Sequence, residues 1–167
     1  MIEVAPDRIE PATTGDLAVI MELERAGFDP AERWSEAAWR DELAGPGRIV
    51  LLARPGLGVI TLRVAGEIAD LHRIVVAADR RRAGTGRRLL EAGLAAARAA
   101  GVRSVLAEVR WDNEPAIALY QRAGFEQLGA RQDYYGPGRH ALILKRYDID
   151  LDDELDSDGR ATSEGRT

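Results

Sequence analysis

The stretch "HRIVVAADRRRAGTGRRLLEAGLAAARAAGVRSVLAEVR", residues 72–110, changes its pattern twice along its length. It begins with a short apolar run typical of a β-strand, and "SVLAEVR" at residues 104–110 has the same character. Between them lies a predicted helix at residues 86–100, with Gly101 placed to end it and apolar side chains at helical spacing on Leu89, Leu90, Leu94 and Ala97. The stretch predicts a strand–helix–strand unit whose two strands are parallel and joined by a right-handed crossover.

The loop of this unit, "RRRAGTGRRLL" at residues 80–90, holds five arginines and two glycines. A helix that begins just after glycines presents unpaired backbone N–H groups and the positive end of its dipole, and phosphate oxygens satisfy both. Arg81, Arg82 and Arg87 add positive charge that we expect to stay unneutralised within the chain. The loop predicts a cradle for a pyrophosphate. The alternative is a surface turn whose arginines serve only the solubility of the protein.

Two better-known phosphate loops do not match this sequence. A Walker A loop needs a lysine followed by Ser or Thr after its last glycine, and the dinucleotide-binding pattern G-x-G-x-x-G would need glycine where Leu89 stands. NTP hydrolysis and NAD binding are therefore disfavoured.

The rest of the chain supplies flanking helices and further strands. Two helices are predicted first, one within residues 13–28 that ends near Gly27 and one within residues 35–43 that Ser35 caps. The remaining predicted elements are strands at residues 48–54, 58–65 and 67–77, a helix at 115–123, and two strands around 125–135 and 140–147. This order predicts an α/β (α+β) domain with one mixed sheet.

Length and composition limit the class of protein. A chain of 167 residues, 46% of them hydrophobic, is long enough for one compact domain. Its start carries acids and prolines where a signal peptide would need an apolar run, and no segment reaches the roughly 18 apolar residues that span a bilayer. A cytoplasmic protein without a membrane partner is expected. The chain has no cysteine, and its two histidines, His72 and His140, are far apart, which argues against a metal site.

The net charge of −5 is distributed unevenly. Residues 148–167 hold eight acidic residues against two arginines, with few apolar residues and no periodicity. We therefore expect a folded domain at residues 1–147 followed by an acidic, disordered tail. Within the domain, six arginines lie between Arg73 and Arg88, a patch so local that it suits a small polyanion better than a long nucleic acid.

Three linked motifs resemble the GNAT superfamily of acetyl-CoA-dependent N-acetyltransferases. They are Arg81-x-x-Gly84-x-Gly86 after a strand, Glu108 in the next strand, and the run Asn113-x-x-Ala116-x-x-x-Tyr120-x-x-x-Gly124-Phe125. Within the superfamily, "EVRWDNEPAIALYQRAGF", "RQDYY" and "RWSEAAW" are similar to the RimI-type branch, the ribosomal-protein alanine N-terminal acetyltransferases. The resemblance covers residues 8–147. It implies a mixed, mostly antiparallel sheet with a central β-α-β unit that binds acetyl-CoA, and flanking helices.

The resemblance also implies roles for the matching positions. Glu108 would be the general base and Tyr120 the general acid. The pantetheine arm of acetyl-CoA would contact the main chain of Ile74, Val75 and Val76, and Asn113 would contact acetyl-CoA near its reacting end. The pyrophosphate would lie in the loop of Arg81, Arg82, Ala83, Gly84, Thr85, Gly86 and Arg87. Arg81 stands where the family often has glutamine.

The residues themselves leave alternatives open for the two proton-transfer positions. Strand alternation places Glu108 on one face with Leu106 and Arg110, and in a strand buried on both faces desolvation would raise the pKa of that carboxyl. The alternative is a structural ion pair between Glu108 and Arg110, or between strands. Tyr120 can donate the proton that amine acetylation returns to the departing thiolate, or it can be a core aromatic. Asn113 can cap the following helix and contact the cofactor at once.

The remaining candidates concern the acceptor. Tyr134 and Tyr135 are expected at the end of a strand, with rings suited to holding a peptide end, and Trp34 is expected on the opposite wall. The predicted activity is acetylation of a protein N-terminal α-amino group, that of a ribosomal protein if the resemblance is faithful. Its alternatives are a small amine or lysine side chain as acceptor, a non-catalytic acetyl-CoA-binding module, and nucleic-acid binding through the arginines.

Overall fold

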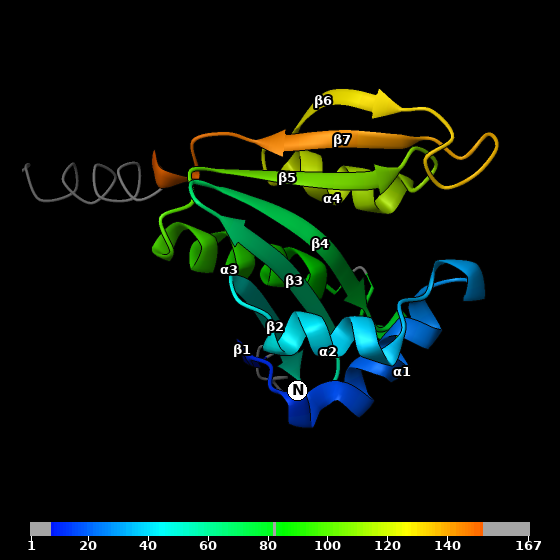
Figure 1. The fold of residues 1–167 in the computed structure, drawn as a ribbon, viewed down its shortest axis with the longest axis vertical. Coiled ribbons are helices and arrows are strands. Elements are labelled where there is room, and N and C mark those ends of the chain that lie inside the picture. Colours follow the sequence, from blue (N-terminus) through cyan, green and yellow to red (C-terminus); the bar gives the residue numbers. More distant parts are fainter. Residues whose placement is uncertain (1–7, 82, 152–167) are drawn as a thin grey trace, which may run out of the picture.

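The computed structural model describes residues 8–81 and 83–151, which form one seven-stranded sheet flanked by helices (Figure 1). The strand order is β1-β2-β3-β4-β5-β7-β6, and among the described strands only β4 and β5 pair in parallel. The strands are β1 (Arg8–Pro11), β2 (Arg48–Arg54), β3 (Gly58–Ala65), β4 (Ile68–Val76), β5 (Ser104–Arg110), β6 (Glu126–Arg131) and β7 (Ala141–Arg146). The helices are α1 (Leu17–Gly27), α2 (Glu36–Ala44), α3 (Thr85–Ala99) and α4 (Glu114–Arg122). The predicted mixed, mostly antiparallel sheet with a central β-α-β unit is confirmed.

Local sequence signals explain most of these elements. Helix α3 begins within one residue of its predicted start, because Gly84 adopts the left-handed conformation (φ +84°) that few other residues tolerate. Helix α2 begins where Ser35 Oγ accepts a hydrogen bond from the Ala38 N–H at 3.1 Å. Strand β1 is not among the predicted elements. It is short and charged, and its strand character comes from pairing with β2 at the sheet edge.

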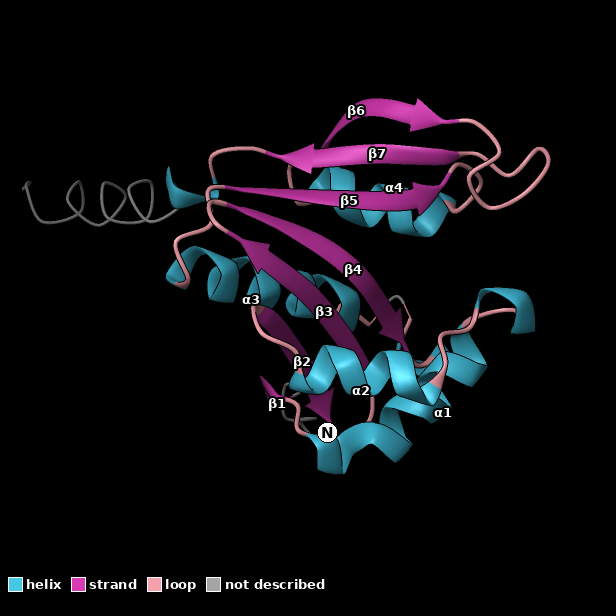
Figure 2. Ribbon diagram, in the orientation of Figure 1, coloured by secondary structure: helices cyan, strands magenta, loops and turns pink. Residues whose placement is uncertain are grey.

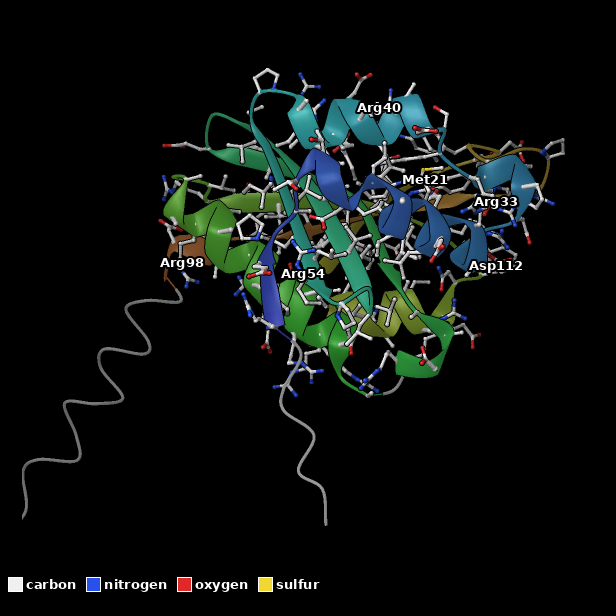
Figure 3. The ribbon with its side chains drawn as sticks, turned by 90° about the horizontal axis from the view of Figure 1, so that it is seen from below. Met21, Arg33, Arg40, Arg54, Arg98 and Asp112 are labelled. Atoms are coloured by element: carbon white, nitrogen blue, oxygen red, sulfur yellow. The ribbon has the colours of Figure 1, made fainter. Side chains whose placement is uncertain are left out.

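The helices lie on both faces of the sheet (Figure 2). Two apolar cores lie between the helices and the sheet. The larger core lies against α3 and α4, and includes Leu89, Leu90 and Tyr120. The smaller one lies against α1 and α2 and is centred on Ile20 and Trp39. Figure 3 shows α1 and α2 along one side of the sheet and α3 along the other.

The sheet splits between its two parallel strands. β4 and β5 pair only from Ile68 opposite Ser104 to Leu71 opposite Ala107. Beyond that point the strands diverge, as Figure 1 shows. Half of the backbone N–H and C=O groups along the rest of β4 therefore face a gap instead of a neighbouring strand.

The C-terminal part of the body differs from the predicted outline. Strand β6 ends at Arg131 because Asp133 turns the chain with φ +55°, so Tyr134 and Tyr135 lie in the β6–β7 loop and not in a strand. Ile149 is fully buried against the larger core, and its N–H donates to the Arg103 carbonyl at 2.9 Å. The packed body thus extends past the predicted boundary at residue 147, while residues 152–167 of the predicted tail lie outside the described residues.

Within the described residues, no helix is long and apolar enough to cross a membrane. No group of three or more His, Cys, Asp or Glu side chains there could hold a metal ion.

Candidate active site

Two cavities open on the split between β4 and β5, with volumes of about 680 and 640 Å³. They share Leu71, His72, Arg73, Glu108, Tyr134 and Tyr135, so they are two parts of one site. The first cavity extends toward α2 and Trp34. The second extends toward the start of α4 and the segment that follows α1.

A β-bulge in β4 shapes the site. Arg73 lies opposite Thr61 and Leu71 lies opposite Leu62, so His72 is one extra residue in β4. Successive side chains of a strand normally point to opposite faces. The bulge instead turns His72 and Arg73 to the same side, where His72 meets Glu42 of α2 and Arg73 meets Glu24 of α1. Because a bulge also bends its strand, it accounts for the divergence of β4 from β5.

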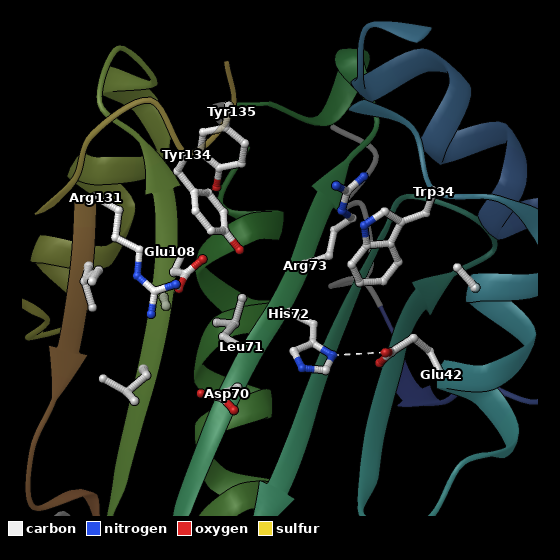
Figure 4. A pocket seen from close by; sticks show the side chains of 14 residues that line it. Trp34, Glu42, Asp70, Leu71, His72, Arg73, Glu108, Arg131, Tyr134 and Tyr135 are labelled. Carbon is white, nitrogen blue, oxygen red and sulfur yellow. Dashed lines mark hydrogen bonds and ion pairs between the residues drawn. The ribbon is translucent and has the colours of Figure 1, made fainter. Parts of the chain in front are cut away.

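Glu108 lies on the β5 face that opens into the first cavity (Figure 4). Its carboxylate lies 3.7 Å from Arg131 Nη1 and near the Tyr134 phenol, whose pKa it raises. The alternation of β5 is confirmed, but burial on both faces is wrong: the Glu108 side chain is 33% exposed, because α1 and α2 leave this part of the sheet uncovered. Glu108 is therefore not the buried acid that the strand pattern predicts.

Arg110 does not pair with Glu108, but the other form of the structural alternative, an ion pair between strands, is supported: Glu108 of β5 lies 3.7 Å from Arg131 of β6. Arg110 binds Asp112 and Glu32, both at 2.8 Å, and these two carboxylates raise its pKa. The Glu108 carboxylate is left to the cavity, with Arg131 as its cationic neighbour.

Aromatic rings line two opposite walls of the first cavity (Figure 4). Tyr134 and Tyr135 stand edge to face with ring centroids 5.0 Å apart. On the other wall, Trp34 packs against Trp39 at 5.1 Å and under the Arg73 guanidinium at 4.4 Å. The structure thus brings the three predicted acceptor-binding residues to facing walls of one cavity.

Tyr120 and Asn113 both line the second cavity. Tyr120 is 4% exposed and packs against Phe125, so it is a core aromatic that also borders the site. Burial, and then the nearby Tyr135, raise the pKa of its phenol. Asn113 caps α4, its Oδ1 accepting from the Ala116 N–H at 3.3 Å, which confirms the predicted cap.

The start of α3 carries the predicted phosphate loop. The first hydrogen bond within this helix runs from the Arg88 N–H to the Gly84 carbonyl at 3.0 Å, so the amides of Gly86 and Arg87 precede the helical ladder. Gly86 lies under Val76 and Leu119, which a Cβ there would meet at 3.4 and 3.5 Å.

The side chains of this loop fit the prediction less closely than its backbone does. Arg81 and Ala83 are exposed, and Thr85 is buried. Arg87 pairs with Glu91 one turn along the helix at 2.9 Å, so the expectation that its charge stays unneutralised is wrong. The predicted position Arg82 lies outside the described residues.

Two buried acids that sequence analysis did not single out hold the bulged strand. Glu24 pairs with Arg73 and accepts hydrogen bonds from the Trp34 N–H at 2.8 Å and from Trp39 Nε1 at 3.2 Å. Burial lowers the pKa of Arg73, and Glu24 opposes that shift. Glu24 follows Ile20 and Leu23 on the apolar stripe of α1, and an acid on such a stripe is the signal that could have identified it.

Glu42 is the corresponding acid on α2. It accepts hydrogen bonds from Thr61 Oγ1 at 2.5 Å and lies 3.0 Å from His72 Nδ1, with Arg48 Nε at 3.4 Å. Burial raises its pKa, but the bonds from His72 and Thr61 outweigh burial and the net pKa is lowered. Glu42 therefore lies ionised beside the cavity.

Comparisons with known proteins agree with this geometry. The model of the acetyltransferase (GNAT) family matches residues 6–125, and the chain belongs to that family. It is 36% identical over 152 residues to the N-alpha-acetyltransferase RimI of Mycobacterium tuberculosis, covering 86% of this chain and 94% of that one. It is 35% identical to the uncharacterized protein ML0378 of Mycobacterium leprae, of whose length it covers only 41%.

A solved structure extends the comparison to the fold. The ribosomal-protein-S18-alanine N-acetyltransferase from Escherichia coli superposes with a TM-score of 0.75 at 28% identity, covering 86% of this chain and 94% of that one. The predicted RimI-type resemblance is confirmed. The chain is an acetyl-CoA-dependent N-acetyltransferase, with acetyl-CoA as its co-substrate.

Proposed function

We propose that this enzyme transfers the acetyl group of acetyl-CoA to the N-terminal α-amino group of a protein substrate, and that the substrate is a ribosomal protein. The similarity to RimI of M. tuberculosis and to the S18-alanine enzyme of E. coli supports this substrate class. An acceptor cavity with aromatic walls, wide enough for the end of a chain, supports it as well. A ribosomal substrate would place the activity in the cytoplasm.

The cofactor side of the site uses main-chain groups. The split leaves the β4 backbone at Ile74, Val75 and Val76 without a strand partner on the β5 side, and an extended pantetheine arm has amides that can pair there. The loop Arg81, Arg82, Ala83, Gly84, Thr85, Gly86 and Arg87 would hold the pyrophosphate at the start of α3. Asn113, at the mouth of the second cavity, would contact the reacting end. Acetyl-CoA, when bound, supplies the activated acetyl group.

The acceptor side uses side chains. The peptide end lies between Trp34 on one wall and Tyr134 and Tyr135 on the other, with its amine beside Glu108. Glu108 accepts a proton from that amine, directly or through a water, and general-base help of this kind is worth about 10²- to 10⁴-fold in rate. The Tyr134 phenol lies beside Glu108, which raises its pKa and so keeps it protonated next to the carboxylate.

Tyr120 serves as the acid. Its raised pKa keeps the phenol protonated at neutral pH, which an acid requires. A phenol with a raised pKa is a poor donor to a thiolate in water, but the same burial raises the basicity of a sulfur anion that forms next to it.

The observation that carries the proposal is the position of Glu108, at the split and on the border of both cavities. The test is incubation of the protein with acetyl-CoA and a hexapeptide that begins with alanine, followed by mass spectrometry. We expect one acetyl group on the free amine and none on the same peptide with a blocked amine. Acetylation of an internal lysine in the blocked peptide, or no product with either peptide, would contradict the proposal.

A further inference from the structure

His72 and Glu42 form a carboxylate–imidazole pair in the wall of the acceptor cavity (Figure 4). Both residues line the first cavity, together with Glu108. The β-bulge that turns His72 toward Glu42 also places its ring between the aromatic walls and the carboxylate of α2. The imidazole is 27% exposed and the Glu42 carboxylate only 9%, so the ring lies between a buried anion and the cavity.

The hydrogen bonds of this pair determine which ring nitrogen carries the proton. An ionised carboxylate only accepts hydrogen bonds, and the lowered pKa of Glu42 keeps it ionised. The His72 Nδ1 must therefore carry the proton in the 3.0 Å contact with Glu42 Oε1. In the neutral ring Nε2 then has a lone pair, and Figure 4 shows it turned away from Glu42.

Acetylation of an amine leaves two protons to account for. A terminal α-amino group has an ordinary pKa of about 8, so it reaches the site mostly as an ammonium ion. The reaction forms an N–C bond, breaks the C–S bond of the thioester and removes two protons from nitrogen. One proton equivalent ends on the sulfur and one in solvent. A carboxylate such as Glu108 has room for only one of them at a time.

We propose that His72 is a second proton acceptor for the acceptor amine and that Glu42 is the positioning residue that fixes its tautomer. The inference rests on the proposed function, because it needs an ammonium substrate in the first cavity. His72 Nε2 takes the first proton as the ammonium enters and passes it to solvent, which leaves Glu108 free for the proton lost during attack. Carboxylate–imidazole pairs act in this way where the carboxylate holds one ring nitrogen and the other faces the substrate.

Other charges surround this pair and enter any pH profile. Asp70 and Arg73 flank His72 on β4, Glu108 faces it from β5 and Arg131 from β6, and Tyr134 and Tyr135 close the cavity from the loop. Arg48 Nε lies 3.4 Å from the Glu42 oxygen that His72 also contacts. Arg73 has the same sign of charge as a protonated imidazole and is paired with Glu24, and Glu108 has Arg131 near it.

The test begins with His72→Gln and Glu42→Gln assayed on the alanine hexapeptide. We expect kcat to fall about 100-fold for His72→Gln, the lower end of the range for proton transfer, and about 10-fold for Glu42→Gln. The matched control for the second variant is Glu36→Gln, which removes a carboxylate from the exposed face of the same helix, where it pairs with Arg40 at 2.8 Å. This control should keep wild-type kcat.

Two further readouts separate proton transfer from a structural role. Added imidazole should restore part of the activity of His72→Ala, and it should leave unchanged the activity of His140→Ala, whose ring lines neither cavity. As the pH rises, log kcat/KM should increase more steeply for wild type than for His72→Gln, because the variant lacks one proton acceptor.

The outcomes distinguish this inference from the proposed function. An active wild type with unchanged kcat in His72→Gln would overturn the inference alone. So would a higher peptide KM with unchanged kcat, or loss of activity without imidazole rescue and with an unchanged pH profile. A wild type that does not acetylate the hexapeptide would overturn the proposed function first.

Discussion

The two sides of the split between β4 and β5 are built from different parts of the chain. On the α3 side, one continuous stretch offers backbone amides at Gly86 and Arg87 and the open edge of β4. On the α1–α2 side, the cavity is made of side chains from six separate segments, with Glu108 and His72 among them. Main-chain groups suit acetyl-CoA, the ligand that all members of the family share. Side chains can change from one member to another with the acceptor. We therefore expect changes on the first side to alter the KM for acetyl-CoA, and changes on the second to alter turnover and peptide choice.

The largest expected effect is that of Glu108→Gln on the acceptor side. Glutamine keeps the shape of the side chain but cannot accept the amine proton at neutral pH. We expect kcat for the alanine hexapeptide to fall by about 10²- to 10⁴-fold, with the KM for acetyl-CoA little changed. Steady-state kinetics with each substrate varied in turn makes the measurement. A loss in the affinity for acetyl-CoA as large as the loss in kcat would show that Glu108 also serves cofactor binding, and would contradict the separation of the two sides.

The next effect is on stability and concerns the support of the acceptor wall. Glu24→Gln leaves the Arg73 guanidinium buried without its counter-ion, since Glu24 is fully buried. We expect the free energy of unfolding to fall by about 3 kcal/mol in urea denaturation. Glu22→Gln, on the exposed side of the same helix, should change it by less than about 0.5 kcal/mol. Equal effects of the two variants would show that the ion pair does not hold the bulged strand.

A smaller effect is expected on the cofactor side from Gly84→Ala. Gly84 has φ +84°, and a Cβ there would also meet Arg88 Nη1 at 3.0 Å. The left-handed conformation costs a non-glycine residue about 1–2 kcal/mol, so the loop should shift and the KM for acetyl-CoA rise about 10-fold.

Gly66→Ala provides the matched control for this variant. Gly66 has φ +65° in the turn between β3 and β4, with nothing within 4 Å of an added Cβ. Its stability loss should be similar and its KM for acetyl-CoA that of wild type. A rise in KM in both variants would mean that lost stability, and not the loop, weakens cofactor binding.

The smallest effect is a pH dependence of stability. The pKa of Glu42 is lowered in the folded protein from its ordinary value of 4.5. A lowered folded pKa gives stability that is present above pH 4.5 and lost as the pH falls through the folded pKa. Thermal unfolding of Glu42→Gln should therefore depend less on pH below 4.5 than that of wild type. Parallel curves for the two proteins would contradict the role of the ionised carboxylate.

The difference between a cofactor side built from one continuous stretch and an acceptor side built from separate segments explains what could be predicted from the sequence. The start of α3 could be predicted because Gly84 and Gly86 act through local backbone geometry. Glu108 and Tyr120 could be named from motif spacing, although the exposure of Glu108 depends on how far α1 and α2 cover the sheet. The bulge at His72 could not be predicted, because it depends on the register between β3 and β4.

Other parts of the acceptor cavity were beyond prediction for a similar reason. Glu42 meets His72 across 30 positions of sequence, and no local pattern links them. Tyr134 and Tyr135 were expected in a strand, since the turn at Asp133 depends on a positive φ at a residue that does not require one.

The most direct test of the account is a crystal structure of the protein with coenzyme A and the alanine hexapeptide. The account predicts the diphosphate at the N-terminus of α3 and the pantetheine along β4 from Ile74 to Val76. It predicts the peptide nitrogen in the first cavity, within about 3 Å of Glu108 or of one bridging water. A peptide amine outside that cavity, or a diphosphate bound away from α3, would contradict it.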